Sequence, residues 1–320
     1  MATSNLGVIV AWSGFALAFI FGAVGNKVNF CTMGSVADIV NMGDWGRMRM
    51  WLLAIAVAII GSHTLQLLGL VDLSKSIYTT PNFTWLAFIV GGFAFGIGMT
   101  LGSGCGSKTL IRVGGGSLKS LVVYVFLGVS AYMTLRGLFG QFRVSALQPV
   151  AVNFEAYGIK GQDLPALLAG TGIELNTLRI TIAAVITAVL LVFVFKDREF
   201  RANFDYILGG VVVGLVVVAG WYVTGHLGYQ ENPDTLEMTF FGTNTRAAES
   251  LSFVAPLAYT LELLMLWTDK SLAATFGIMA AFGVVVGSFA YAIAFKKFRW
   301  EGFTTAEDLG NHIIGGILMG

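Results

Sequence analysis

Charged residues are scarce in this sequence of 320 residues, since Asp, Glu, Lys and Arg together make up only 12% of it. An ordinary soluble domain carries roughly 25%. Hydrophobic residues account for 56%, and the mean hydropathy is +0.78. This composition excludes a soluble globular protein. The formal net charge of +1 provides no basic surface of the kind that binds nucleic acid, so we expect no nucleic-acid partner.

Cysteine, histidine and proline are also rare. Two cysteines cannot form a disulfide framework that stabilises a chain of this length, so Cys31 and Cys105 are treated as two separate thiols. The histidines, His63, His226 and His312, are dispersed along the sequence, and we expect neither a metal site nor a cofactor. Glycine, in contrast, occurs 41 times against 5 prolines, which is typical of closely packed membrane helices.

Long apolar stretches predict an all-α polytopic membrane protein. A bilayer core about 30 Å thick needs roughly 20 apolar residues per spanning helix. We assign eight stretches as spans, the last of which is still running where the sequence stops: 6–24, 50–71, 85–102, 118–139, 180–195, 207–223, 272–295 and 312–320. A ninth stretch, 251–267, contains Pro256 and Glu262 and is ambiguous.

The charges of the loops indicate whether the ninth stretch, 251–267, spans the membrane. Lysine and arginine collect in short cytoplasmic loops. With the N-terminus outside and no span at 251–267, most cations lie in inner loops, whereas an extra span would move Lys296, Lys297 and Arg299 outside. We therefore predict that 251–267 is re-entrant or interfacial. The same topology makes 140–176 an outer loop, with a small helix near 164–168.

Weak internal symmetry predicts an inverted repeat, which is common in transporters. Segment 15–31, which ends at Cys31, resembles 206–226, and the glycine pattern of 91–96 resembles 315–320. In the predicted topology the matching segments cross the membrane in opposite directions. We describe the chain as one transmembrane domain (1–320) with a first repeat of about 6–139 and an incomplete second repeat of about 206–320.

Residues that carry chemistry gather where a glycine-rich span ends, at 101–116. Residues at i, i+3, i+4 and i+7 share a helix face. This spacing aligns Cys105, Lys108, Thr109 and Arg112. Backbone N–H groups at a helix start attract anions, and Gly104 and Gly106 allow a ligand to approach closely. The segment therefore predicts an anion site with a thiol, a hydroxyl and one or two cations, and it lacks the residue order of a nucleotide-binding loop.

A second segment, 26–35, repeats this theme, because Lys27 lies four residues before Cys31 and Ser35 four residues after it. Where a helix is interrupted within the membrane, its free backbone N–H and C=O groups need hydrogen bonds from protein or water. Both segments are therefore predicted to be re-entrant. A buried cysteine is most often a small hydrophobe, but a lysine at membrane depth favours a functional site. His226, at the repeat position of Cys31, and Glu262, a partner for a nearby cation, are secondary candidates.

Three motifs resemble those of a known family: 28–34, 96–110 and 115–119. They are similar to the YeeE/YedE family of bacterial inner-membrane sulfur-compound transporters, and the resemblance covers nearly the whole chain. It implies thiosulfate uptake, an inverted repeat with re-entrant helices that meet at the centre, and path cysteines that contact the sulfur end of the ion. Carried over to this sequence, those cysteines are Cys31 and Cys105. The family pattern also has a further glycine–cysteine element, so we expect the natural chain to continue past Gly320.

The chemistry of thiosulfate fits these residues. The ion is a dianion with a soft terminal sulfur, so it needs nearby positive charge and weak donors such as neutral thiols. Lys27 and Lys108 are the expected charge compensators. Nothing in the chain suggests ATP coupling, so uptake is expected to depend on a gradient, on consumption inside the cell, or on a partner such as a cytoplasmic sulfur carrier or sulfurtransferase.

Two alternatives remain open at this stage. A membrane-bound sulfurtransferase would carry a persulfide on Cys105, but no suitable general acid or base lies near either cysteine in the sequence. A permease for another anion or for a selenium compound fits the charges equally well.

Overall fold

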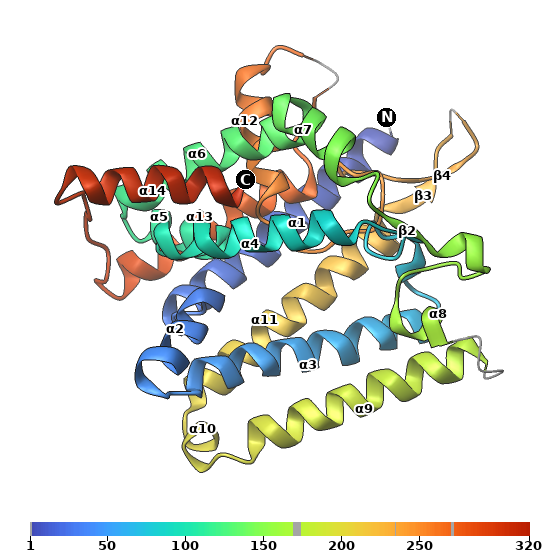
Figure 1. The fold of residues 1–320 in the computed structure, drawn as a ribbon, viewed down its shortest axis with the longest axis horizontal. Coiled ribbons are helices and arrows are strands. Elements are labelled where there is room, and N and C mark those ends of the chain that lie inside the picture. Colours follow the sequence, from blue (N-terminus) through green and yellow to red (C-terminus); the bar gives the residue numbers. More distant parts are fainter. Residues whose placement is uncertain (1, 169–173, 234, 270–271) are drawn as a thin grey trace.

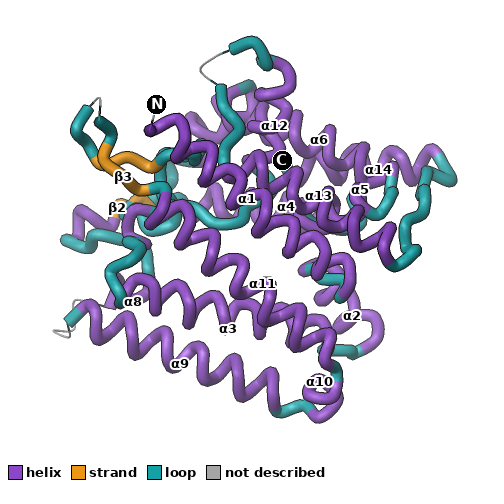
Figure 2. The backbone as a smooth tube through the Cα atoms, turned by 180° about the vertical axis from the view of Figure 1, so that it is seen from behind, coloured by secondary structure: helices purple, strands orange, loops and turns teal. Residues whose placement is uncertain are grey.

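The computed structural model describes residues 2–168, 174–233, 235–269 and 272–320, and helices dominate it (Figures 1 and 2). The helices are α1 (Ala2–Lys27), α2 (Thr32–Met42), α3 (Gly46–Leu67), α4 (Trp85–Leu101), α5 (Gly106–Gly114), α6 (Leu118–Arg136), α7 (Leu138–Phe142), α8 (Leu164–Leu168), α9 (Leu175–Phe195), α10 (Arg198–Ala202), α11 (Phe204–Tyr222), α12 (Ala255–Met265), α13 (Phe276–Ala294) and α14 (Ala306–Met319). Two small antiparallel sheets pair β1 (Asn82–Phe83) with β2 (Val152–Asn153), and β3 (Tyr229–Glu231) with β4 (Met238–Phe240). The all-α membrane fold expected from the sequence is confirmed.

Seven helical segments among the described residues are long and apolar enough to cross a membrane. They account for seven of the eight predicted spans. The eighth, expected at 312–320, belongs to α14, which has 14 residues and a length of about 21 Å at 1.5 Å per residue. That length is short of the bilayer core, so the predicted number of eight spans is not confirmed.

Three short helices interrupt the long ones. Helices α2 and α12 have 11 residues each and α5 has 9, so each is about 14–16 Å long, roughly half of a bilayer core. Helix α12 lies within the stretch 251–267, where the loop charges disfavour a span. The small helix predicted near 164–168 is α8, in the part of the outer loop that the structure describes; residues 169–173 of that loop lie outside the described ranges.

Glycine allows the central helices to pack with their backbones close together. Helix α1 lies against α13, where a side chain at Gly22 would collide with the carbonyl of Val284 and one at Gly287 with the carbonyl of Phe19. Helices α9, α3 and α11 lie side by side on one flank, and α4, α14 and α6 on the other (Figures 1 and 2). Such contacts are the usual use of small residues between membrane helices.

Helices of the first half of the chain pack in pairs against helices of the second half. The first helix of the first half, α1, packs on α13, while α11 packs on α3, and α4 packs on α14. An internal repeat that aligns α1 with α11, α3 with α13 and α4 with α14 produces this pattern. The glycine patterns 91–96 and 315–320 lie in α4 and at the end of α14, so the sequence match aligns these two helices. The inverted repeat itself stays a prediction.

Ion pairs join loops that the charge argument assigned to one side of the membrane. Arg112 and Glu301 pair at 3.2 Å, and the backbone N–H of Arg299 donates to the carbonyl of Gly115. The end of α13 therefore lies at the same face as the turn between α5 and α6. This contact fits the predicted topology in which 251–267 does not span, and that topology stays a prediction.

Candidate functional site

Both cysteines follow the same local break in a long helix. Asn29 (φ 56°) and Ser103 (φ 57°) adopt the left-handed conformation two residues before Cys31 and Cys105, respectively. This backbone conformation is uncommon for residues other than glycine, and it ends the preceding helix. Each cysteine then has an extended backbone and caps a short helix, Cys31 at α2 and Cys105 at α5.

The two thiols lie together, and the N-termini of α2 and α5 converge on them. Cys31 and Cys105 are 4% and 8% exposed, and their side chains are mutual hydrogen-bond partners. The Sγ of Cys31 accepts the N–H of Gly34 at 3.2 Å. The Sγ of Cys105 lies 3.3 Å from the hydroxyl of Ser107 and also has the backbone N–H of Thr32, at the start of α2, as a partner. Helix starts carry partial positive charge, so this arrangement favours electron-rich ligands.

A cavity of about 350 Å³ leads to Cys31. Its lining includes five cationic side chains and one carboxylate: Arg47, Lys108, Arg112, Lys297, Arg299 and Glu301. Cys105 is absent from the lining and lies behind Cys31. The cavity is therefore a positively charged space with one thiol in its wall and a second thiol behind the first.

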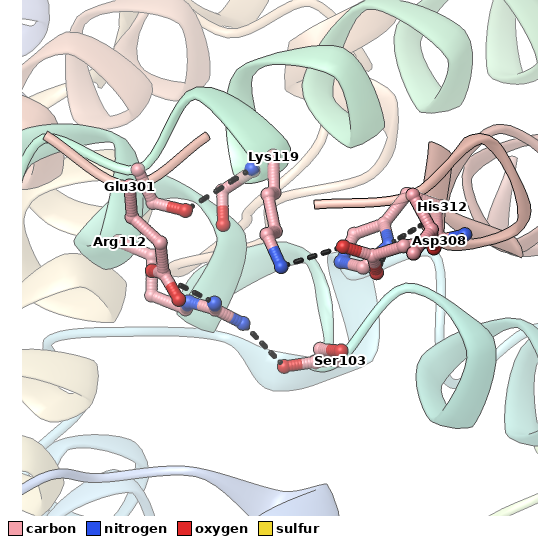
Figure 3. A network of polar contacts seen from close by, with 9 residues as sticks. Ser103, Arg112, Lys119, Glu301, Asp308 and His312 are labelled. Atoms are coloured by element: carbon pink, nitrogen blue, oxygen red, sulfur yellow. Dashed lines mark hydrogen bonds and ion pairs between the residues drawn. The ribbon is translucent and has the colours of Figure 1, made fainter. Parts of the chain in front are cut away.

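Lys108 and Arg112 enter the cavity from α5. The Nζ of Lys108 donates to the Oδ1 of Asn29, which links the two helix breaks. Arg112 donates to the carbonyl of Ser103 at 3.1 Å and to Glu301 at 3.2 Å (Figure 3). Burial alone would raise the pKa of Glu301, but the hydrogen bond and charge of Arg112 outweigh it and lower that pKa.

A second ion-pair network lies beside the first. Lys119 reaches Asp308 at 2.6 Å, and Asp308 also contacts the Nδ1 of His312 at 3.1 Å (Figure 3). The hydrogen bond from Lys119 lowers the pKa of Asp308. Together the two networks fasten the segment after α13, and the start of α14, to α5 and α6.

Several predicted path residues lie elsewhere. Lys27 pairs with Asp205 of α11 at 2.9 Å and does not line the cavity, because the break at Asn29 ends the helical spacing that was expected to align Lys27 with Cys31. Thr109 is 2% exposed and packs in the core. Ser35 is close to Cys31, but its hydroxyl donates to the Cys31 carbonyl at 2.7 Å.

Gly104 and Gly106 flank Cys105, and their role in letting a ligand approach stays a prediction. A Cβ at Gly104 would lie 3.0 Å from the Cγ of Lys108, and one at Gly106 would lie 3.5 Å from the Cβ of Phe253. The absence of a side chain at Gly104 therefore lets Lys108 pack closely at the start of α5, whereas a Cβ at Gly106 would make an ordinary contact with Phe253.

The two secondary candidates belong to other parts of the molecule. His226 lies in a π-helical turn (Val223–Leu227), where its Nδ1 is 3.0 Å from the carbonyl of Leu70 and its ring stacks on Tyr222. The match of His226 with Cys31 stays a prediction; the β3–β4 hairpin separates this turn from the next short helix, α12. Glu262 is 4% exposed and pairs with Arg136 of α6 at 3.0 Å, which ties α12 to α6.

Sequence reasoning missed several cavity residues: Asn26, Asn29, Arg47, Lys297, Arg299 and Glu301. Asn29 carried a recognisable signal, because asparagine tolerates the left-handed conformation that breaks a helix. Asn26 belongs to α1 and Arg47 to α3, whereas Lys297, Arg299 and Glu301 come from the loop between α13 and α14. None of these five residues carried a local signal. Within the described residues, no group of three or more His, Cys, Asp or Glu side chains is placed to hold a metal ion.

Comparison with known proteins identifies the family of this chain. The sequence profile of the family described as sulphur transport matches residues 27–320. The thiosulfate transporter TsuA of Spirochaeta thermophila is 28% identical over 218 residues, which cover 66% of this chain and 62% of that protein. The thiosulfate transporter TsuA of Escherichia coli K12 is 24% identical over 323 residues, which cover 96% of this chain and 82% of that protein. The match thus spans less than two thirds of the Spirochaeta protein. With seven segments able to cross a membrane and a family profile that matches nearly its whole length, this chain is a multi-pass membrane protein that belongs to the sulphur transport family.

Proposed function

We propose that this protein takes up thiosulfate, and that the ion passes Cys105 and then Cys31 before it enters the cation-lined cavity. The observation that carries the proposal is the position of the Cys31 thiol, which lines a positively charged cavity and contacts a second buried thiol. Both relatives described above are named thiosulfate transporters, which supports the choice of ion.

The cavity has the charge that a dianion requires. Arg47 pairs with Asp38 and Arg112 with Glu301, whereas Lys108, Lys297 and Arg299 have no ion-pair partner among the described residues. These three cations offset the desolvation of a doubly charged ion. Lys108 is the one that lies on the same short helix as Cys105.

Thiols suit transport because they bind weakly. A neutral thiol is a weak donor, so it can contact a polarisable sulfur without holding the ion. Passage requires sites that are favourable enough to enter and weak enough to leave. Two adjacent thiols provide two such sites in sequence.

The proposed direction of transport rests on the topology predicted from the loop charges. The cavity is lined by cations of the loops predicted to be cytoplasmic, such as Lys297 and Arg299. In this proposal the protein lies in a bacterial inner membrane as an inverted repeat, and the cavity is the inner exit. A cytoplasmic sulfur carrier or sulfurtransferase that consumes the ion would keep uptake favourable.

A sulfurtransferase is the second candidate, because Cys105 lies at a helix N-terminus beside Ser107 and Lys108. In that reaction the Cys105 thiolate would attack the terminal sulfur of thiosulfate. The S–S bond would break, sulfite would leave with its electron pair, and a persulfide would remain on Cys105. The geometry favours transport, since both thiols are almost completely buried.

Uptake of sulfur-labelled thiosulfate by cells that carry the protein tests the proposal, with sulfate and selenite as competitors. Cys31→Ala and Cys105→Ala should each lose most uptake, Cys105→Ser should restore little, and His226→Ala, which changes a residue outside the path, should transport normally. Mass spectrometry of the wild-type protein should find no stable extra sulfur on Cys105. Normal uptake by Cys105→Ala would refute the thiol path, whereas a persulfide without uptake would favour the transferase.

A further inference from the structure

We propose that Arg47 binds the oxygen end of the transported ion beside Cys31, and that Asp38 and Gly34 hold Arg47 in place for this role. The inference rests on the proposed function and assigns a specificity residue to the same cavity. Arg47 is the second residue of α3, close to the turn that joins α3 to α2.

Asp38 fixes the guanidinium of Arg47. Asp38 is 5% exposed on α2, and it accepts from both the Nε and the Nη2 of Arg47 in a two-pronged ion pair. Such a fork sets both the position and the plane of a guanidinium. Arg47 is therefore held in one orientation before any ligand arrives.

The remaining nitrogen of Arg47 points at the first turn of α2. A Cβ at Gly34 would lie 2.6 Å from the Nη1 of Arg47, 3.2 Å from its Cζ and 3.4 Å from the Cβ of Cys31. The guanidinium thus occupies the space that a side chain at Gly34 would need. Glycine at this position lets Arg47 pack against the first turn of α2, the helix that Cys31 caps.

The Nη1 group is the donor left for a ligand. Among the described residues, the hydrogen bonds of Arg47 use Nε and Nη2, and Arg47, Gly34 and Cys31 all line the cavity. A soft thiol and a hard, planar cation therefore border the same space. This pair matches an ion with a terminal sulfur at one end and sulfur-bound oxygens at the other.

Arg47 has a different task from Lys108. Because Asp38 neutralises most of its charge, Arg47 contributes little to attraction at a distance and mainly orients the oxygens by directional hydrogen bonds. Loss of this orientation should weaken binding of the ion beside Cys31 and reduce the preference for thiosulfate over sulfate, while the ion that does bind still leaves through the cavity at its usual rate.

The test measures KM, maximal rate and sulfate competition for labelled thiosulfate uptake in Arg47→Lys, Asp38→Asn and Gly34→Ala. We expect KM to rise about tenfold or more in each, as loss of a hydrogen bond to a charged group predicts. Sulfate should compete more strongly, and the maximal rate per folded protein should stay within about twofold of wild type. Size-exclusion chromatography in detergent gives the amount of folded protein.

Matched controls separate orientation from folding. Arg49, two residues further along α3, pairs with Asp197 at 2.9 Å outside the cavity, so Arg49→Lys and Asp197→Asn should keep wild-type KM. Gly91→Ala, where a Cβ meets no atom within 4 Å, should also be neutral.

Three results would decide against the inference. Arg47→Lys with wild-type KM and wild-type sulfate competition would overturn it while leaving the proposed function intact. An equal rise in KM for Arg49→Lys would also overturn it, since the effect would then be structural. A folded wild-type protein that neither binds nor transports thiosulfate would overturn both the proposed function and the role of Arg47.

Discussion

Replacing Lys108 with Gln should raise the KM for thiosulfate because it removes the cation that lies on the same helix as Cys105. The Nζ of Lys108 reaches Asn29 across the helix break and lines the cavity next to the thiols. Gln keeps much of the length and polarity of the side chain but not its charge. Lys108→Arg keeps the charge, so it should recover most of the lost affinity.

The size of the effect follows from the surroundings of Lys108. Coulomb's law at an effective dielectric constant of about 20 gives about 8 kcal/mol between one charge and a dianion at about 4 Å, before desolvation is subtracted. Hydrogen bonds to charged groups contribute about 1.5–3 kcal/mol net, because desolvation offsets most of the attraction. Lys297 and Arg299 also remain in the cavity of the variant. We therefore expect KM to rise by about 10- to 150-fold.

Initial rates of labelled thiosulfate uptake over a range of concentrations measure this change. Lys196→Gln is the control, since Lys196 follows α9 on the predicted inner side and does not line the cavity. A KM for Lys108→Gln within about twofold of wild type, a change that corresponds to less than about 0.5 kcal/mol, would refute the reasoning. Equal losses in Lys108→Arg and Lys108→Gln would show that shape, and not charge, is what matters at this position.

Two further predictions concern stability. Gly287→Ala should destabilise the protein by about 1–3 kcal/mol, because the new methyl group meets the Phe19 carbonyl of α1; a melting temperature equal to that of Gly91→Ala in detergent would contradict this. Burial raises the pKa of Glu249, which lies outside the spans, to about 7. A raised pKa means that this contribution to stability is complete below about pH 4.5 and is lost as the pH rises through about 7. Glu249→Gln should therefore flatten the fall in melting temperature between about pH 5 and 8, and an equally steep fall in the variant would show that other groups cause it.

Local sequence signals were enough to place most helices. Helix α4 begins at Trp85 and α6 at Leu118, as the apolar stretches predicted, and α9 ends at Phe195. These boundaries depend on the length of an apolar run and on the residues that interrupt it, which the sequence displays directly. The glycine-rich break before Cys105 was predictable for the same reason.

The cavity could be predicted only in part. Lys108 and Arg112 share α5 with Cys105, so helical spacing found them. Glu301 meets Arg112 across 189 residues of sequence, and Arg47 reaches Cys31 only because α3 folds back on α2. Such contacts are products of tertiary packing and have no periodic pattern. Lys27 was wrongly expected to lie near Cys31, because helical spacing was assumed between the two residues, and the helix is in fact interrupted at Asn29.

The repeated break explains why two thiols meet at one point. Each cysteine follows a left-handed residue by two positions and caps a short helix, so two helix N-termini are aimed at the same pair of sulfur atoms. Helix starts attract an anion without the full charge of a lysine, and thiols donate only weakly. On the proposed path, attraction is therefore mild at Cys105, which lies outside the cavity lining, and stronger at Cys31, which shares the cavity with the cations. An ion at Cys105 then meets increasing positive charge toward the cavity, so its energy falls in that direction, while net uptake still depends on a gradient or on consumption of the ion inside the cell.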